Sequence, residues 1–470
     1  MGEREETPMS TGAAPRRPNV LIITCHDIGD YWGCYGTPVR TPHIDALAAE
    51  GVLFERHFST ATVCSPSRGS ITTGCYPPTN GLTGNVHRGD EIDLARCPTL
   101  AMLLARAGYE THLFGFQHEH WDARRLGYGE VHQGASRHVD DVAPLFAEWL
   151  GGRPAGAGPF LAAMGFTETH RNGMAPSGFT YAHYRPADPA EVEVRPYLPD
   201  IPSVRRELAD FYGAIALVDE GLGTVLEAID AAGLREDTVV VFTSDHGASF
   251  LHSKATLLDG GVKVGLLMRY PRALPAGRRV RALTSHVDIL PTLFALLGIA
   301  TPAHVQGRSA LPQIWGTDEA GREYVFGGRD YGARMARSER FKYIRHLTAH
   351  CTYDVGMREI ILCPAGLWQN QEVVDHYEAQ RGIEELYDLE RDPAELHNLT
   401  LNAEDRAAYA EPLARMRAAL DAHLERTGDE FAGLYVPPGL QPPERAWEAV
   451  REAQRRRDPN LAAVVALGEV

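Results

Sequence analysis

The chain has 470 residues, of which 44% are hydrophobic and 23% are charged, and its formal net charge is −16 at pH 7. A chain of this length and apolar content can bury one large core, alone or with a smaller one, and is not intrinsically disordered. Nucleic acids and anionic membranes bind basic surfaces, so the acidic balance argues against both as partners.

The first residues show no targeting or membrane segment. Residues 1–17 are polar and lack the apolar stretch of a secretory signal, and no later run approaches the roughly 18 apolar residues that span a bilayer. We therefore expect a disordered tail over 1–17 and a soluble, cytoplasmic protein. Cysteine is scarce and lacks CxxC spacing, so neither a disulfide framework nor a zinc knuckle is expected. Most of the seven cysteines should be buried: Cys25, Cys34, Cys64, Cys75, Cys97, Cys351 and Cys363.

From residue 18 to about 320, apolar runs typical of buried strands alternate with helical patterns. NVLIITCHD (19–27) predicts a strand covered on both faces. TPHIDALAAEG (41–51) predicts a helix with Thr41 as N-cap, proline in the first turn and glycine as the stop. The alternation returns over 98–116, 159–166 and 205–247. It predicts an α/β domain whose large, mainly parallel or mixed sheet is flanked by helices.

Four predicted strands are each followed by polar, chemically active side chains. Asp27, His118, His170 and Asp245 stand at or just after these strand ends. One histidine after a strand is usually structural, but ligands of α/β sheets gather beyond the carboxyl ends of the strands. Four such ends therefore indicate a site along one edge of the sheet.

The later part of the chain has a different pattern. Residues 321–430 contain short strand patterns and turns, then an amphipathic helix from about Glu404 to Arg426. This predicts a smaller C-terminal antiparallel sheet-plus-helix unit packed on the first domain. Residues 431–470 begin rich in proline and become heavily charged, which predicts a linker followed by a tail or surface helix.

The segment CSPSRG (64–69) places Cys64 four residues before Arg68. A tyrosine-phosphatase loop would need five residues between the cysteine and the arginine, and here there are three. A zinc ligand would need partners at ligand spacing, and these are missing. A Cys–His hydrolase is conceivable because histidines are abundant, but the sequence fixes no pair.

The run CSPSRGSITTG resembles the signature of type I sulfatases, formylglycine-dependent members of the alkaline phosphatase superfamily, in which the cysteine of C-x-P-x-R is oxidised to formylglycine. NVLIITCHDIG, TSDHG, HSKATLLDGGVKVGLLMRYP and ELYDLERDPAELHNL are similar to further landmarks of that family in the same order. The resemblance spans roughly residues 18–400 and is greatest to N-sulfoglucosamine sulfohydrolase-like (heparan N-sulfatase-like) members. It implies an alkaline-phosphatase-like fold and hydrolysis of a sulfate ester or sulfamate, for example of an N- or O-sulfated sugar or an aryl sulfate.

The resemblance also implies a metal centre. Its ligands would be Asp27, His26, Asp245, His246 and the modified residue Cys64, and the expected ion is Ca²⁺, with Mn²⁺, Mg²⁺ or Zn²⁺ as alternatives. Hydrated formylglycine carries two hydroxyls on one carbon. One attacks sulfur; the other then loses its proton, so the carbonyl reforms and sulfate is expelled. Making this residue requires a separate formylglycine-generating enzyme as a maturation partner, and a homodimer is compatible with the assignment.

The remaining roles follow from the same resemblance. Arg68 would orient residue 64, and His118 would hydrogen-bond its hydroxyl and act as the base that releases sulfate. Lys254 and His170 would contact sulfate oxygens and protonate the leaving group. Arg171 and His87 are the candidates for substrate recognition.

Two residues depart from the family pattern. His26 stands where most members carry a second aspartate, which weakens the preference for Ca²⁺ and favours Mn²⁺ or Zn²⁺. Phe116 stands where many members carry a lysine that helps to bind sulfate. Two alternatives therefore stay open: a phosphonate or phosphate mono- or diester hydrolase using the same modified residue, and a catalytically degenerate binder of sulfated glycans.

Overall fold

The computed structural model describes residues 17–171, 179, 183–329, 332–346 and 382–433. The tails predicted over 1–17 and 431–470 therefore lie almost wholly outside the described residues, as do Cys351 and Cys363. Within the described part, no helix combines the length and the apolar character needed to cross a membrane.

The central sheet has eight strands among the described residues. In spatial order they are β10 (Arg278–Val280), β2 (Val52–Phe54), β9 (Leu266–Arg269), β7 (Thr238–Ser244), β1 (Asn19–Cys25), β6 (Phe160–Phe166), β4 (Glu110–Gly115) and β5 (Glu130–His132). Strand β9 is antiparallel to β2 and β7, and the other neighbouring pairs are parallel. The predicted large, mainly parallel sheet is thereby confirmed.

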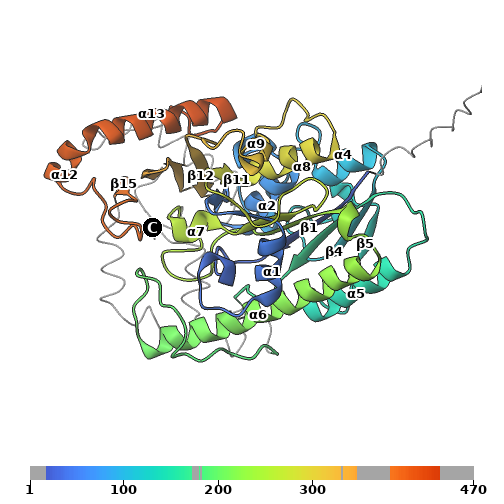
Figure 1. The fold of residues 1–470 in the computed structure, drawn as a ribbon. Coiled ribbons are helices and arrows are strands. Elements are labelled where there is room, and N and C mark those ends of the chain that lie inside the picture. Colours follow the sequence, from blue (N-terminus) through green and yellow to red (C-terminus); the bar gives the residue numbers. More distant parts are fainter. Residues whose placement is uncertain (1–16, 172–178, 180–182, 330–331, 347–381, 434–470) are drawn as a thin grey trace, which may run out of the picture.

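Helices cover both faces of this sheet (Figure 1). The helices of the α/β part are α1 (Pro42–Glu50), α2 (Cys64–Thr73), α3 (Pro77–Asn80), α4 (Leu100–Arg106), α5 (Val139–Gly151), α6 (Pro202–Ala231), α7 (Asp259–Val262), α8 (Ile289–Leu297) and α9 (Leu311–Trp315). One apolar cluster joins β1 to α1, α5 and α6, and the other joins β1 to α4, α8 and α9.

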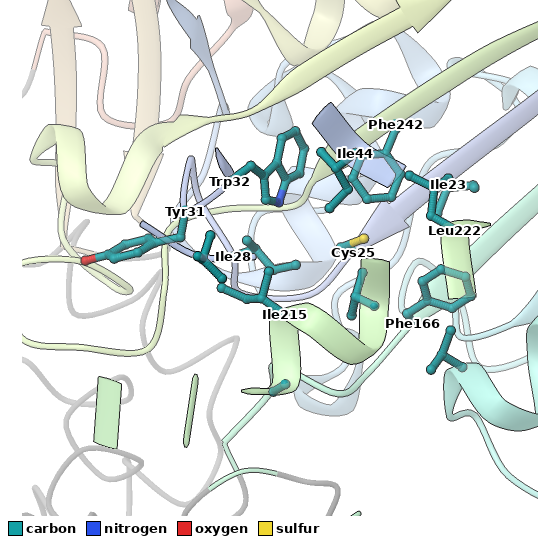
Figure 2. Packing of buried hydrophobic residues seen from close by; sticks show 14 of the residues in the cluster. Ile23, Cys25, Ile28, Tyr31, Trp32, Ile44, Phe166, Ile215, Leu222 and Phe242 are labelled. Carbon is teal, nitrogen blue, oxygen red and sulfur yellow. The ribbon is translucent and has the colours of Figure 1, made fainter. Parts of the chain in front are cut away.

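All seven residues of β1 are buried. Leu21 and Ile23 point into the cluster with α6, whereas Val20 and Ile22 point into the opposite cluster. Successive side chains of a strand face opposite sides of a sheet, which explains why the four consecutive residues 20–23 of this strand are all apolar. Figure 2 shows the α6 side, where Ile23 and Phe242 lie among side chains such as Leu222.

The start of α1 is capped by a distant residue. The sequence predicted Thr41 as the N-cap, and Thr41 occupies that position, but its hydroxyl is hydrogen-bonded to Asp45 Oδ1. The backbone amides of His43 and Ile44 instead donate to Asp219 Oδ1 of α6, at 3.0 and 2.8 Å. The cap thereby ties α1 to α6, and its carboxylate complements the positive end of the helix dipole.

A smaller antiparallel sheet forms the C-terminal part, as predicted. Among the described residues its strands are β12 (Val325–Arg329), β13 (Ala333–Arg337), β14 (Phe341–His346) and β15 (Glu384–Asp388), and α12 (Ala403–Ala408) and α13 (Ala410–Thr427) follow. The helix predicted over Glu404–Arg426 is thus two helices that meet at Tyr409. A short sheet of β11 (Thr284–Ser285), β3 (His57–Phe58) and β8 (Lys263–Val264) completes the sheets of the described chain. The domain boundary near residue 320 stays a prediction.

Candidate active site

The carboxyl ends of β1 and β7 carry the central groups of the site. These strands are parallel neighbours, and their last residues, Cys25 and Ser244, are paired in register. The polar residues that follow them therefore emerge side by side: His26 and Asp27 after β1, and Asp245 and His246 after β7. The placement follows the general rule for open α/β sheets.

Residue 64 completes this cluster from helix α2. Cys64 Sγ lies 3.3 Å from His246 Nε2 and 3.7 Å from His26 Nδ1. Asp27 Oδ1 lies 3.0 Å from His26 Nδ1 and 3.2 Å from His246 Nε2, and Asp245 Oδ2 lies 3.4 Å from His26 Nδ1. All five side chains are buried, and their ligand atoms lie within 4.8 Å of one another. Five groups predicted from separate motifs thus meet at one point.

The backbone of Asp27 is in the left-handed region, with φ of 47°. A non-glycine residue rarely adopts this conformation, and it costs about 1 kcal/mol or more. The surroundings hold it there. The Asp27 amide donates to Asp245 Oδ1 at 3.0 Å, and the Ser249 hydroxyl donates to Asp27 Oδ2 at 2.6 Å. These two hydrogen bonds hold the strained backbone conformation and so fix the direction in which the Asp27 carboxylate points.

Each carboxylate of the cluster has its own cation. Lys254 Nζ donates to Asp27 Oδ2 at 2.7 Å, and Arg68 Nε donates to Asp245 Oδ2 at 3.0 Å. Burial alone would raise the pKa of Asp27, but Lys254, and after it His246, hold that pKa well below its usual range. The pKa of Asp245 is likewise held low against burial, by His246, His26 and Arg68. Both carboxylates are therefore ionised at neutral pH.

Arg68 lies one turn after Cys64 on α2, so both side chains face the same direction. Its guanidinium also donates to the backbone carbonyls of Thr24 and Cys25 at 3.3 Å and lies 5.0 Å from the centre of the Phe116 ring. These contacts connect Arg68 to the end of β1 and to Asp245. Its role in orienting residue 64 stays a prediction.

His118 lies beside the cluster on the segment that follows β4. Its ring stacks on His87 at 5.9 Å and meets Phe116 edge-on at 5.6 Å. Burial, with smaller contributions from His26 and Arg68, lowers the pKa of His118 to about 3. Its Nδ1 is buried and has no hydrogen-bond partner among the described residues. The ring is thus neutral at pH 7, the form that can accept a proton.

The two residues predicted to act after β6, His170 and Arg171, lie in different surroundings. His170 Nε2 lies 3.5 Å from Lys254 Nζ, and its ring meets His26 edge-on at 4.6 Å, which places His170 in the cluster. Arg171 is 3% exposed, forms an ion pair with Glu207 at 2.8 Å and lies over the Phe179 and Phe250 rings. The substrate-binding role of Arg171 stays a prediction.

Sequence reasoning missed two groups that shape the site. Ser249 holds Asp27, and Ser67 donates its hydroxyl to the backbone carbonyl of Asp245 and lies 3.0 Å from His286 Nδ1. Ser67 stands inside the marked segment CSPSRG, whereas Ser249 lies two residues after the marked segment TSDHG. Closeness to those segments was the available signal, but a serine there is equally compatible with a turn or a cap.

Comparison with known families shows which family the chain belongs to. Residues 18–299 match the family model described as Sulfatase. The chain belongs to the sulfatase family. Residues 247–355 also match the model described as N-sulphoglucosamine sulphohydrolase, C-terminal. The resemblance stated from the motifs is thereby confirmed, and this sulfatase is a sulfuric ester hydrolase.

The relatives of this sulfatase act on different compounds. An ulvan-active sulfatase of Formosa agariphila is 29% identical, with 88% of this chain and 76% of that protein covered. The human N-sulphoglucosamine sulphohydrolase is 28% identical, with 82% and 86% covered. The phosphonate monoester hydrolase of Agrobacterium radiobacter has a similar structure, with a TM-score of 0.64, 25% identity, and 86% of this chain and 96% of that chain covered.

Members of the sulfatase family use a divalent metal and a formylglycine. The cluster fits such an ion, because two ionised carboxylates and two imidazoles converge in a buried space. The donor set is mixed. Ca²⁺ prefers oxygen ligands alone, whereas imidazole suits Mn²⁺, Zn²⁺ and other transition metals.

Cys64 is poorly suited to act as a thiolate. Burial, reinforced by Asp245 and Asp27, raises the pKa of its thiol well above the ordinary value, although Lys254 opposes the shift. Reactive cysteines need the opposite, a lowered pKa in a positive environment. The unmodified thiol is therefore protonated at neutral pH, which argues against the Cys–His hydrolase that the sequence had left open.

Proposed function

We propose that this sulfatase removes sulfate from a small sulfated sugar, as an ester or a sulfamate, with a formylglycine formed from Cys64 as its nucleophile. The observation that carries the proposal is the position of Cys64. Its Sγ lies 3.7 Å from His26 Nδ1 and 3.3 Å from His246 Nε2, within the same cluster as Asp27 and Asp245. The nature of the relatives, which include an N-sulphoglucosamine sulphohydrolase and an ulvan-active sulfatase, supports a sulfated glycan as substrate.

Asp27, His26, Asp245, His246 and residue 64 would hold the divalent ion. When bound, the ion would neutralise charge on the sulfate group and favour an ionised oxygen on residue 64. Hydrated formylglycine would supply a hydroxyl nucleophile on a carbon that can return to a carbonyl. A neutral thiol at the same position offers neither property.

The cations of the site would bind the sulfate. Lys254 lies beside Asp27, and its ammonium group would donate a further hydrogen bond to a sulfate oxygen. His170, 3.5 Å from Lys254 Nζ, would protonate the oxygen or nitrogen of the departing sugar. Arg68 would act on the centre through Asp245, because it keeps that carboxylate ionised and in place.

His118 would serve as the base. Its neutral ring could take the proton from the second hydroxyl of residue 64 when sulfate leaves. The exposed His87, stacked on His118, would then face the sugar. Calcium as the metal, a generating enzyme as the maturation partner, a homodimer and a cytoplasmic location belong to the same proposal and stay predictions.

Peptide mass spectrometry and kinetics test this proposal together. The peptide that contains residue 64, from protein made with a generating enzyme, should show the mass change from thiol to aldehyde. Turnover of aryl sulfate and N-sulfoglucosamine should appear only in that preparation. Cys64→Ala, made in parallel, should fold normally and lose at least about 10³-fold in kcat/KM, since the nucleophile is gone. A fully active protein with an unmodified Cys64 would contradict the proposal.

A second candidate is a phosphonate or phosphate ester hydrolase. The structural similarity to a phosphonate monoester hydrolase favours it, because sulfate and phosphonate esters are both tetrahedral anions. Parallel kinetics on aryl sulfate and aryl phosphonate would separate the two. A preference of kcat/KM for the phosphonate would replace the sulfatase proposal for the natural substrate. Binding of a sulfated glycan without turnover in formylglycine-containing protein would support the degenerate binder.

A further inference from the structure

A second cluster of metal-ligating side chains lies at the edge of the central sheet, apart from the catalytic cluster. Strand β5 is an edge strand, and within the described residues it pairs with β4 alone. His112 lies on β4, and Glu130 and His132 lie at the two ends of β5. In the parallel register, Glu130 is opposite His112, and His132 is opposite Phe114. The strand pairing thus brings three potential ligands together on one face.

Three atoms of this cluster form a nearly regular triangle. His112 Nδ1 lies 3.1 Å from His132 Nε2 and 3.4 Å from Glu130 Oε2, and His132 Nε2 lies 3.5 Å from the same carboxylate oxygen. Ligands of a tetrahedral zinc ion, each roughly 2.0–2.1 Å from the metal, are about 3.3–3.4 Å apart. The triangle therefore has the size of one face of such a site.

We propose that His112, His132 and Glu130 form a second divalent-metal site, which takes Zn²⁺ or a similar transition metal. The set of two imidazoles and one carboxylate is a zinc-type donor set, with the remaining position left for water. The site does not depend on the function proposed for the catalytic cluster, because the two share no residue.

The surroundings hold both rings in position. His132 stacks on Phe114 at 4.3 Å with an angle of 3° between the ring planes, and His112 packs against Trp149 of α5 at 4.5 Å. Helix α5 lies beside β4 and β5 on this face (Figure 1). The rings are therefore oriented before any metal binds, which lowers the entropic cost of binding.

A second carboxylate stands behind one of the ligands. Glu110 Oε2 lies 3.6 Å from His112 Nε2, the ring nitrogen that faces away from the triangle. Metal-binding histidines commonly present their other ring nitrogen to a carboxylate, which fixes the tautomer and strengthens the ligand. Arg153 pairs with Glu110 at 2.6 Å and so holds this carboxylate in place. Burial lowers the pKa of both His112 and His132, which favours the neutral rings that metal ligation needs.

The location gives the site a structural consequence. The segment 116–129 runs from the end of β4 to the start of β5 and carries His118. Strand β5 has only three residues, and an edge strand this short has few hydrogen bonds of its own. A metal bound between the two strands would clamp both ends of the segment, and so would stabilise the position of His118.

Metal counting tests the proposal. The purified full chain would be stripped of metal with a chelator and then titrated with Zn²⁺. Elemental mass spectrometry would count the bound zinc ions, and competition with a zinc-binding dye would measure their affinity. Glu130→Gln and His132→Gln should each bind one zinc ion fewer per chain than the wild type, or bind it at least 100-fold more weakly. Glu110→Gln should weaken the same ion about 10- to 100-fold. The side chain of Glu130 is 64% exposed, so Glu130→Gln should fold normally.

Two further variants separate this site from other zinc binding. Asp245→Asn should remove zinc from the catalytic cluster and leave the edge site intact. His397→Gln, which breaks an exposed His–Asp pair with Asp405, should bind as much zinc as the wild type. An equal number and affinity of zinc ions in the wild type, Glu130→Gln and His132→Gln would overturn the proposal. An equal loss in His397→Gln would overturn it as well.

Discussion

Lys254 Nζ lies 2.7 Å from Asp27 Oδ2, and the two side chains are only 5% and 0% exposed. This ion pair joins the segment after β7 to the end of β1, at the point where the candidate metal ligands meet. A buried carboxylate needs such a partner, because burial without one would favour its protonated form. Lys254 therefore compensates the charge of the Asp27 carboxylate whether or not a substrate is present.

Lys254→Met should destabilise the protein as well as inactivate it. Removal of one partner of a buried ion pair leaves an uncompensated charge, and we expect the free energy of unfolding in chelator to fall by about 3 kcal/mol. A divalent ion should restore part of this loss, since it would compensate the carboxylate. Urea titrations with chelator and with added Ca²⁺ or Mn²⁺ would measure both effects.

Lys263→Met is the matched control for that experiment. Lys263 pairs with Asp30 at 3.0 Å, but its side chain is 31% exposed. A pair that is partly accessible to solvent contributes less than a buried one, about 0–1 kcal/mol, so this variant should lose less stability than Lys254→Met. If the two variants had equal free energies of unfolding, the Lys254–Asp27 pair would contribute no more to stability than the Lys263–Asp30 pair.

His26→Asp should change the metal preference of the catalytic cluster. The substitution replaces an imidazole nitrogen with a carboxylate oxygen next to Asp27 and Asp245. Harder ligands favour Ca²⁺, so we expect the ratio of Ca²⁺ to Zn²⁺ affinity to rise at least tenfold, which corresponds to about 1.4 kcal/mol. Calorimetric titration of the metal-free protein would measure both affinities.

His26→Ala controls for loss of the ring alone. It removes a nitrogen ligand without adding an oxygen, so it should weaken binding of Zn²⁺ more than that of Ca²⁺, and the Ca²⁺ to Zn²⁺ ratio should rise less than in His26→Asp. The ring also packs against Phe116 and His170, so thermal unfolding should be followed for both variants. A Ca²⁺ to Zn²⁺ ratio that is the same in His26→Asp and the wild type would rule out His26 as a ligand.

His423 should contribute to acid sensitivity. Its ring is buried on Phe326 at 4.0 Å, and burial, followed by Arg426, lowers its pKa to about 3. The unfolded chain binds a proton here below about pH 6.5, whereas the folded chain does so only near pH 3. Stability contributed by the neutral ring is thus lost as the pH falls through this window, by up to about 1.4 kcal/mol per pH unit.

His423→Phe should flatten that dependence. Phenylalanine keeps an aromatic ring on Phe326 and cannot bind a proton. Urea titrations at several pH values between 7 and 4 would give the free energy of unfolding as a function of pH. Its slope should be smaller in the variant than in the wild type, by an amount that corresponds to at most one bound proton. An unchanged slope would mean that His423 becomes protonated in the folded protein above this range.

Asp219→Ala should weaken the junction of α1 and α6. The variant loses the acceptor for the amides of His43 and Ile44, and we expect the free energy of unfolding to fall by about 1–2 kcal/mol. Asp219→Asn should lose less, because its amide oxygen can still accept. The kinetic constants of both variants should match the wild type, as the cap lies outside the catalytic cluster. If Thr41→Ala lost about 1–2 kcal/mol and Asp219→Ala lost none, Thr41 and not Asp219 would be the residue that caps α1.

Much of this fold could be predicted from the sequence, because the patterns that indicate its strands and helices involve residues close together in the chain. The nearly continuous apolar run of β1 indicates that the strand is buried on both faces, and the alternation of strands and helices indicates a parallel sheet. The break at Tyr409 was missed, because the residues on both sides of it are rich in helix formers such as alanine and glutamate, and local propensity predicts one helix.

The sequence by itself determined the motifs: Cys64 before Arg68, and Asp27 and Asp245 at strand ends. Which groups touch was decided only by the tertiary structure. Asp219 caps α1 from 175 residues away, and Glu130 and His132 meet His112 through strand pairing. Arg171, which the sequence placed among the substrate-binding residues, lies buried against Glu207. Such contacts depend on the packing of elements that are distant in the chain, and a local pattern carries no information about their distance.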